Sequence, residues 1–142
     1  MISNVTVSSS ISASISHVWE SWTNPKHIVK WNFAHESWKC PAATNNLFPG
    51  GDFSWRMEAV DGSMGFDYAG KYIEIEDHAF ILKQLNDGRE VSITFEVMGD
   101  EVLLSEIFEI EHENSAEQQR MGWQAILDYF KRYTEQWYSS NN

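Results

Sequence analysis

A glutamate interrupts an apolar strand pattern late in the sequence. Val102, Leu104, Glu106, Phe108 and Ile110 recur with the period of two that is typical of a strand with one buried face. If Glu106 points inward with these neighbours, burial raises the pKa of its carboxyl, because a desolvated charge is costly. Such a carboxyl could anchor a ligand hydroxyl or act as an acid. A register shift would instead place it at the solvent edge, and the pattern does not separate the two.

A second glutamate, Glu74, falls by the same alternation on one face with Phe66, Tyr68 and Tyr72. Here we favour a bulge or register shift that turns the carboxyl toward solvent. The enzymatic hypothesis would combine Glu106 with Tyr68 or Tyr72 in acid-base chemistry on a bound carbonyl compound.

Other reactive residue types lack the spacing that their chemistry requires. The five histidines show neither His-x-x-x-His nor paired Cys-x-x-Cys spacing, so we expect no metal site. Cys40 is the only cysteine, and we interpret it as a small structural residue rather than as a nucleophile paired with His35. No phosphate-binding glycine motif precedes a helix, so no cofactor is predicted.

The elements that must position these residues follow from hydrophobic periodicity. A first strand is expected around Val5 to Ile11, followed by two short helices capped by Ser14 or Ser16 and by Asn24. The segment from His35 to Gly51 has no clear period and predicts a long connection. Period-two patterns then predict strands over residues 53–57, 66–72, 80–85, 91–97 and 102–110.

A long amphipathic helix is expected at the C-terminal end of the sequence. Asn114 or Ser115 can cap it, and an apolar stripe runs on from Trp123 over about 20 residues. Gly122 lies inside this helix, where glycine costs about 1 kcal/mol relative to alanine. We interpret it as a point where a strand or a ligand approaches the helix closely.

Composition limits the class of protein. The 142 residues are 42% hydrophobic and carry a net charge of -11, which predicts one folded domain over residues 1–142 and argues against binding of nucleic acid. No apolar run approaches a membrane span, and no signal sequence is recognisable at the N-terminus, so we expect a cytoplasmic protein without membrane insertion. A meander covered by one helix predicts an α+β fold in which a curved antiparallel sheet of six or seven strands surrounds the C-terminal helix.

Several segments resemble a known family. Residues 113–135, "ENSAEQQRMGWQAILDYFKRYTE", are similar to the C-terminal helix of the activator of heat-shock-protein-90 ATPase homologue family, within the SRPBCC or START-like superfamily. Residues 22–32, 38–75 and 86–96 resemble its small single-domain bacterial members. The resemblance implies the helix-grip fold, also called START-like or birch-pollen-allergen-like, with a hydrophobic cavity. It implies no particular reaction.

We therefore predict a carrier or sensor that binds an apolar or aromatic molecule, such as a lipid, a flavonoid or a polyketide, rather than an enzyme. The alternatives are a cavity enzyme that uses Glu106 and a chaperone-associated interaction module. A weak homodimer and a chaperone contact stay open. The predicted ligand-binding residues share the inward faces of the sheet and of the helix: Phe53, Trp55, Met57, Phe66, Tyr68, Tyr72, Glu106, Phe108, Gly122, Trp123, Ile126 and Phe130.

Overall fold

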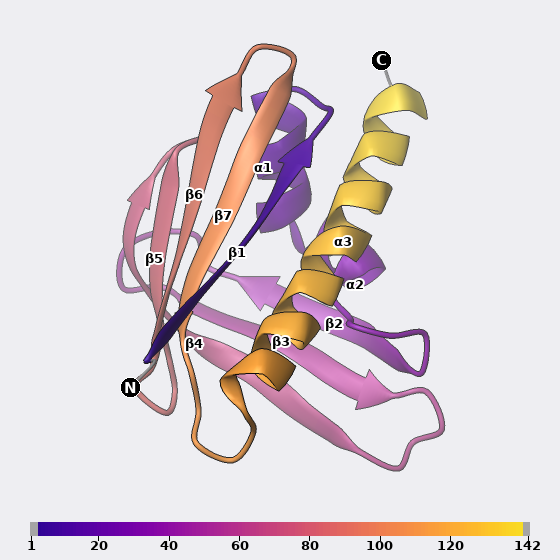
Figure 1. Ribbon diagram of the computed structural model, residues 1–142, viewed down its shortest axis with the longest axis vertical. Helices are drawn as coiled ribbons and strands as arrows, with labels where there is room; N and C mark the ends of the chain where they lie inside the picture. Colours follow the sequence, from indigo (N-terminus) through magenta and orange to yellow (C-terminus); the bar gives the residue numbers. More distant parts are fainter. Residues whose placement is uncertain (1–2, 141–142) are drawn as a thin grey trace.

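A computed structural model describes residues 3–140 of the chain as one curled sheet that holds a long helix (Figure 1). The strands are β1 (Asn4–Ile11), β2 (Trp38–Asn45), β3 (Asp52–Ala59), β4 (Gly65–Glu76), β5 (Phe80–Leu85), β6 (Glu90–Met98) and β7 (Glu101–Glu109). The helices are α1 (Ile15–Thr23), α2 (Pro25–Trp31) and α3 (Ala116–Ser140). This confirms the predicted α+β helix-grip fold.

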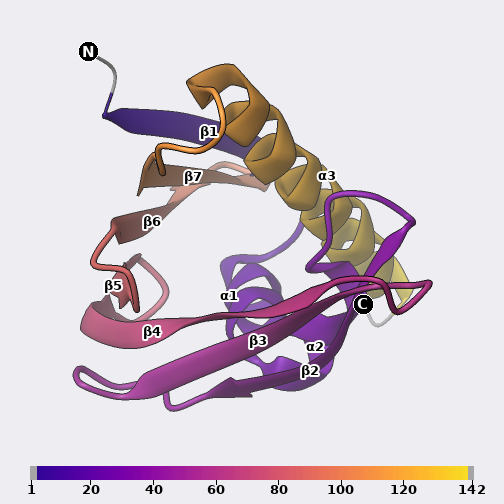
Figure 2. The ribbon, with the colours of Figure 1, turned by 90° about the horizontal axis from the view of Figure 1, so that it is seen from below.

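The sheet has the order β1-β7-β6-β5-β4-β3-β2, with every neighbouring pair antiparallel. Its seven strands curl into a half-barrel, and α3 lies across the open side (Figure 2). The two short helices pack near the β2–β3 end of this trough. The concave face therefore looks toward α3, and its inward side chains form the core.

The predicted helix caps are present. Ser14 Oγ accepts a hydrogen bond from the backbone N–H of His17 at 3.2 Å, and Asn24 Oδ1 accepts one from Lys26 at 2.9 Å. At the start of α3, Ser115 and Gln118 exchange the two hydrogen bonds of a capping box. The helix is 25 residues long rather than about 20.

The expectation of a long connection from His35 to Gly51 is wrong, because residues 38–45 of this segment form β2. The strand pairs with β3 alone and has a register shift between Lys39 and Ala42, around Cys40 and Pro41. Proline has no N–H to donate to a ladder and is tolerated at bulges and edges. The bulge interrupts the period of two, which is the signal that would have revealed a strand.

Aromatic side chains dominate the core between the sheet and the helices. Phe130 of α3 is 0% exposed, and its ring meets those of Trp22 and Trp31 edge-on at 5.0 and 4.9 Å between centroids. Hydroxyls also join the helices, since Ser21 Oγ of α1 and Thr134 Oγ1 of α3 are hydrogen-bonded at 2.7 Å. These contacts fix the position of α3 relative to the trough.

Candidate functional site

A pocket of about 270 Å³ lies between the concave face of the sheet and α3. An engineered 150 Å³ cavity can hold benzene, so this space is large enough for a molecule of one or two rings. Six of the lining residues are aromatic. They come from β3, β4 and all three helices. The lining residues are Trp22, Trp31, Asn32, Trp55, Met57, Phe66, Tyr68, Lys83, Arg89, Glu106, Glu111, Gln119, Trp123 and Ile126.

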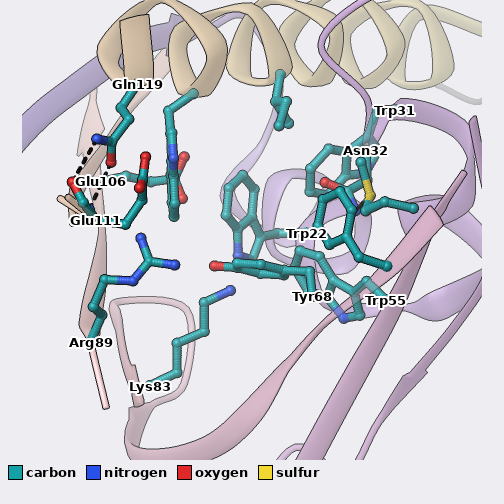
Figure 3. Close-up of a pocket in the computed structure, with 14 residues that line it drawn as sticks. Trp22, Trp31, Asn32, Trp55, Tyr68, Lys83, Arg89, Glu106, Glu111 and Gln119 are labelled. Carbon is teal, nitrogen blue, oxygen red and sulfur yellow. Dashed lines mark hydrogen bonds between the residues drawn. The ribbon is translucent and has the colours of Figure 1, made fainter. Parts of the chain in front are cut away.

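The lining is divided between two ends (Figure 3). Trp22, Trp31 and Trp55 gather at one end, beside Asn32. The charged side chains and Gln119 gather at the other end, where Lys83 lies on β5, Glu106 on β7, Arg89 after β5, Glu111 after β7 and Gln119 on α3. The pocket can therefore accommodate a molecule with an apolar ring system and one polar group.

Glu106 points into this pocket, which is the inward one of the two orientations that the sequence left open. It is 4% exposed and lies in the buried row of β7 with Leu104 and Phe108. Burial raises the pKa of its carboxyl to about 7, and the nearby Lys83 opposes this effect. The neutral form of the carboxyl is therefore far more populated near neutral pH than in an exposed glutamate.

Lys83 is the second ionisable group of the pocket, and the sequence interpretation missed it. It is 1% exposed on β5, and its Nζ lies over the rings of Phe53, Trp55 and Tyr68, 4.4 to 4.7 Å from their centroids. Burial lowers the pKa of its ammonium to about 8, while Glu106 opposes the shift. The aromatic faces favour the charged form, as cation–π contacts do.

Lys83 and Glu106 have no hydrogen-bond or ion-pair partner within residues 3–140. In that part of the chain, no side-chain nitrogen or oxygen closed off from solvent lacks a partner. The polar atoms of the two residues must therefore face the open space of the pocket, where a ligand or solvent can reach them. Buried charges in proteins are ordinarily paired, which makes these two groups unusual.

Tyr68 joins the two ends of the pocket. Its ring packs against Phe53 and Trp55, and its hydroxyl points toward the charged side chains (Figure 3). Burial raises the pKa of this phenol, with a further contribution from Glu106, so the hydroxyl keeps its proton and can donate a hydrogen bond.

Hydrogen bonds hold the side chains of the charged end in place. Arg89 Nε donates to Asp87 at 2.8 Å, and Gln119 Nε2 donates to the carbonyl of Glu111 at 3.0 Å. Gln119 Oε1 also accepts from the N–H of Glu111, which ties the start of α3 to the segment after β7. Asn32 at the aromatic end donates to Met57 Sδ at 3.1 Å.

Seven of the twelve predicted ligand-binding residues line the pocket: Trp55, Met57, Phe66, Tyr68, Glu106, Trp123 and Ile126. Phe66 is 52% exposed and borders both the pocket and an adjoining surface groove, so it lies at the entrance. Trp123 is half-buried, and its ring stacks on Phe108 at 4.0 Å.

The other five predicted residues lie elsewhere. Phe53, Phe108 and Phe130 are buried behind the lining, and the Tyr72 hydroxyl donates to Asn45 at 2.9 Å, away from Glu106. Gly122 borders the groove rather than the pocket, and a Cβ built on it would meet nothing within 4 Å. The expectation that a strand approaches Gly122 closely is therefore wrong, because the neighbouring Trp123 and Ile126 span the distance to the sheet; the approach of a ligand there stays a prediction.

The remaining candidates behave as structural residues. Glu74 is exposed, and a register shift between Tyr72 and Glu74 turns it outward, as we favoured from the sequence. Cys40 is buried, and burial raises the pKa of its thiol, which makes a poor nucleophile. Among residues 3–140, no group of three or more His, Cys, Asp or Glu side chains could hold a metal ion, and no helix is long and apolar enough to cross a membrane.

Comparison with known proteins places the chain in a family. The sequence profile of the "Activator of Hsp90 ATPase homolog 1-like protein" family matches residues 12–135. The chain belongs to this family. No curated protein matches it.

Solved structures of the family have the same fold. The AHSA1-like protein from Aeromonas hydrophila is 35% identical, with a TM-score of 0.88 over 94% of this chain and 92% of its own. The protein Chr148 from Cytophaga hutchinsonii is 42% identical, with a TM-score of 0.82 over 98% and 96%. The Aha1 dimer from Colwellia psychrerythraea is 16% identical, with a TM-score of 0.74 over 95% and 97%, which extends the likeness of fold alone.

Proposed function

We propose that this protein binds an aromatic small molecule that carries one hydroxyl or carbonyl group, and that it acts as a carrier or sensor. The observation that carries the proposal is that Lys83 and Glu106, two buried groups without a hydrogen-bond or ion-pair partner among residues 3–140, face a pocket in which six of the lining residues are aromatic. Family membership supports a ligand-binding domain in general terms.

The polar pair explains which ligand fits. The Lys83 ammonium can donate to a ligand oxygen, and Glu106 can accept from a ligand hydroxyl when it is charged. The rings of Trp22, Trp31 and Trp55 supply apolar faces for the rest of the molecule. A purely apolar ligand would leave both ionisable groups without partners, at a cost in binding free energy.

The polar end should therefore discriminate between two ligands of the same shape. We expect Lys83→Met to weaken 2-naphthol binding by roughly tenfold or more, since a hydrogen bond to a charged group contributes about 1.5–3 kcal/mol. Binding of naphthalene should not weaken, because naphthalene makes no such bond and the variant removes the cost of covering the Lys83 ammonium. Quenching of tryptophan fluorescence during titration measures both affinities.

A blocking variant provides the control for location. Ile126→Trp should fill the pocket from α3 and abolish binding of both ligands, whereas Met121→Trp, on the exposed side of the same helix, should leave them unchanged. Equal loss of 2-naphthol and naphthalene affinity in Lys83→Met would show that Lys83 does not select the polar group. Unchanged binding in Ile126→Trp would place the ligand outside the pocket.

Three further expectations from the sequence concern the domain, its location and cofactors. We propose one domain over residues 1–142, a cytoplasmic location and a role without a resident cofactor. The chaperone-associated module and the weak homodimer stay predictions.

A further inference from the structure

The pocket contains a primary amine in a setting that favours reaction with carbonyl compounds. Lys83 supplies the only such amine among the residues of the described chain that line it. The other five lysines of the sequence are Lys26, Lys30, Lys39, Lys71 and Lys131. Two of these form ion pairs: Lys71 with Asp52 at 2.7 Å and Lys131 with Glu135 at 2.8 Å. Lys83 forms no such ion pair among residues 3–140, and the nearby Glu106 acts on it through its charge without a direct contact.

Burial increases the neutral, nucleophilic fraction of the Lys83 amine. With its pKa lowered to about 8, roughly a tenth of Lys83 is neutral at pH 7, compared with less than about a thousandth of an ordinary lysine. Neutral lysine amines in apolar sites are the nucleophiles that form Schiff bases with carbonyl substrates.

We propose that Lys83 captures aromatic aldehydes or ketones in the pocket as an imine, with Glu106 as the proton donor. This inference rests on the proposed function, because the carbonyl compound must first bind beside the aromatic rings. It adds a covalent step to the proposed function and restricts the polar group of the ligand to a carbonyl.

The atoms balance without any further reactant. The lone pair of Lys83 Nζ attacks the carbonyl carbon, the C–N bond forms, and an amine proton passes to the oxygen to give a carbinolamine. The neutral Glu106 carboxyl then gives its proton to the hydroxyl, the C–O bond breaks, and water leaves. The products are a protonated imine on Lys83 and the Glu106 carboxylate, two opposite charges that stabilise each other in the pocket.

Reductive trapping tests the covalent step directly. The protein is incubated at pH 7 with 2-naphthaldehyde and excess sodium cyanoborohydride, which reduces the imine to a stable amine. We expect a single addition with the mass of the aldehyde less one oxygen atom, and peptide mapping should place it on Lys83 at least about tenfold above each other lysine. An excess of 2-naphthalenemethanol, which has no carbonyl, should suppress it by competition.

Variants separate the roles. Lys83→Met should abolish the addition, and Lys71→Met should leave it unchanged. Peptide mapping of the wild-type protein identifies the modified lysine even if Lys83→Met fails to fold. Glu106→Gln should slow trapping by roughly tenfold or more, as loss of a general acid does. An unchanged rate would overturn the role of Glu106.

The two proposals fail in different ways. If 2-naphthalenemethanol quenches tryptophan fluorescence but 2-naphthaldehyde labels all six lysines alike, imine formation at Lys83 is overturned and the binding function stands. If neither compound binds, the pocket does not bind such ligands and both proposals are overturned.

Discussion

Replacing both polar groups of the pocket, in the variant Lys83→Met/Glu106→Leu, is expected to stabilise the protein by about 1–4 kcal/mol near neutral pH. Exchange of buried ionic groups for apolar residues of similar volume often has this effect, because the desolvation cost disappears. The two residues are 1% and 4% exposed and lack direct partners within residues 3–140. Urea denaturation at a series of pH values measures the difference in the free energy of unfolding.

The pH dependence of this gain follows from the two pKa shifts. The folded pKa of Glu106, about 7, is raised above its unfolded value near 4.3, so wild-type stability falls as pH rises between these values. The folded pKa of Lys83, about 8, is lowered from an unfolded value near 10.4, so stability increases as pH rises across that window. The advantage of the variant should therefore be largest at about pH 7 to 8 and smaller near pH 5 and pH 10.

An exposed pair on the same sheet is the matched control. Lys71 and Asp52 form a surface ion pair at 2.7 Å, so Lys71→Met/Asp52→Leu should change stability by less than about 1 kcal/mol, without a maximum near pH 7.5. If instead the Lys83→Met/Glu106→Leu variant were less stable than wild type at pH 7.5, the pair would be a structural element. The argument for a ligand would then lose its main support.

The largest loss of stability is expected from Phe130→Ala, at about 3–5 kcal/mol. Phe130 is 0% exposed and contacts the rings of Trp22 and Trp31 on the two short helices. Truncation leaves a void that these indole rings cannot easily fill, since each is held by other neighbours. The midpoint of urea denaturation, compared with wild type at constant slope, gives the value.

Met121→Ala on the same helix is the control for Phe130→Ala. Met121 is 59% exposed, so its truncation should change the free energy of unfolding by less than about 0.5 kcal/mol. A loss below about 1 kcal/mol for Phe130→Ala would mean that α3 does not close the trough as described.

Periodicity predicted most of the fold because the inward faces of the strands alternate regularly. It placed Trp55 and Met57 on the inward face, left the orientation of Glu106 open, and could have found Lys83, which alternates with Ile81 and Leu85 on β5. Charged residues are rarely buried in proteins, so the alternation alone does not identify Lys83 as a pocket residue. The same alternation failed at Glu74 and in β2, where bulges shift the register.

Three-dimensional proximity accounts for the rest of the site. Arg89, Glu111 and Gln119 reach the pocket from segments at the ends of β6, β7 and α3, which no local pattern connects. Trp22 and Trp31 were expected on short helices, but their place at the aromatic end depends on how those helices pack into the trough. At Gly122, no strand lies close to the helix, because the glycine borders an open groove.

The indole N–H signals of the seven tryptophans provide the most direct measurement of ligand binding in the pocket. Trp22, Trp31, Trp55 and Trp123 line it, whereas Trp19 and Trp137 do not. In a two-dimensional ¹H–¹⁵N NMR titration with 2-naphthol, we predict saturable shifts of the first four signals and unchanged positions for Trp19 and Trp137. Absence of any saturable shift, or shifts confined to Trp19 and Trp137, would contradict binding between the sheet and α3.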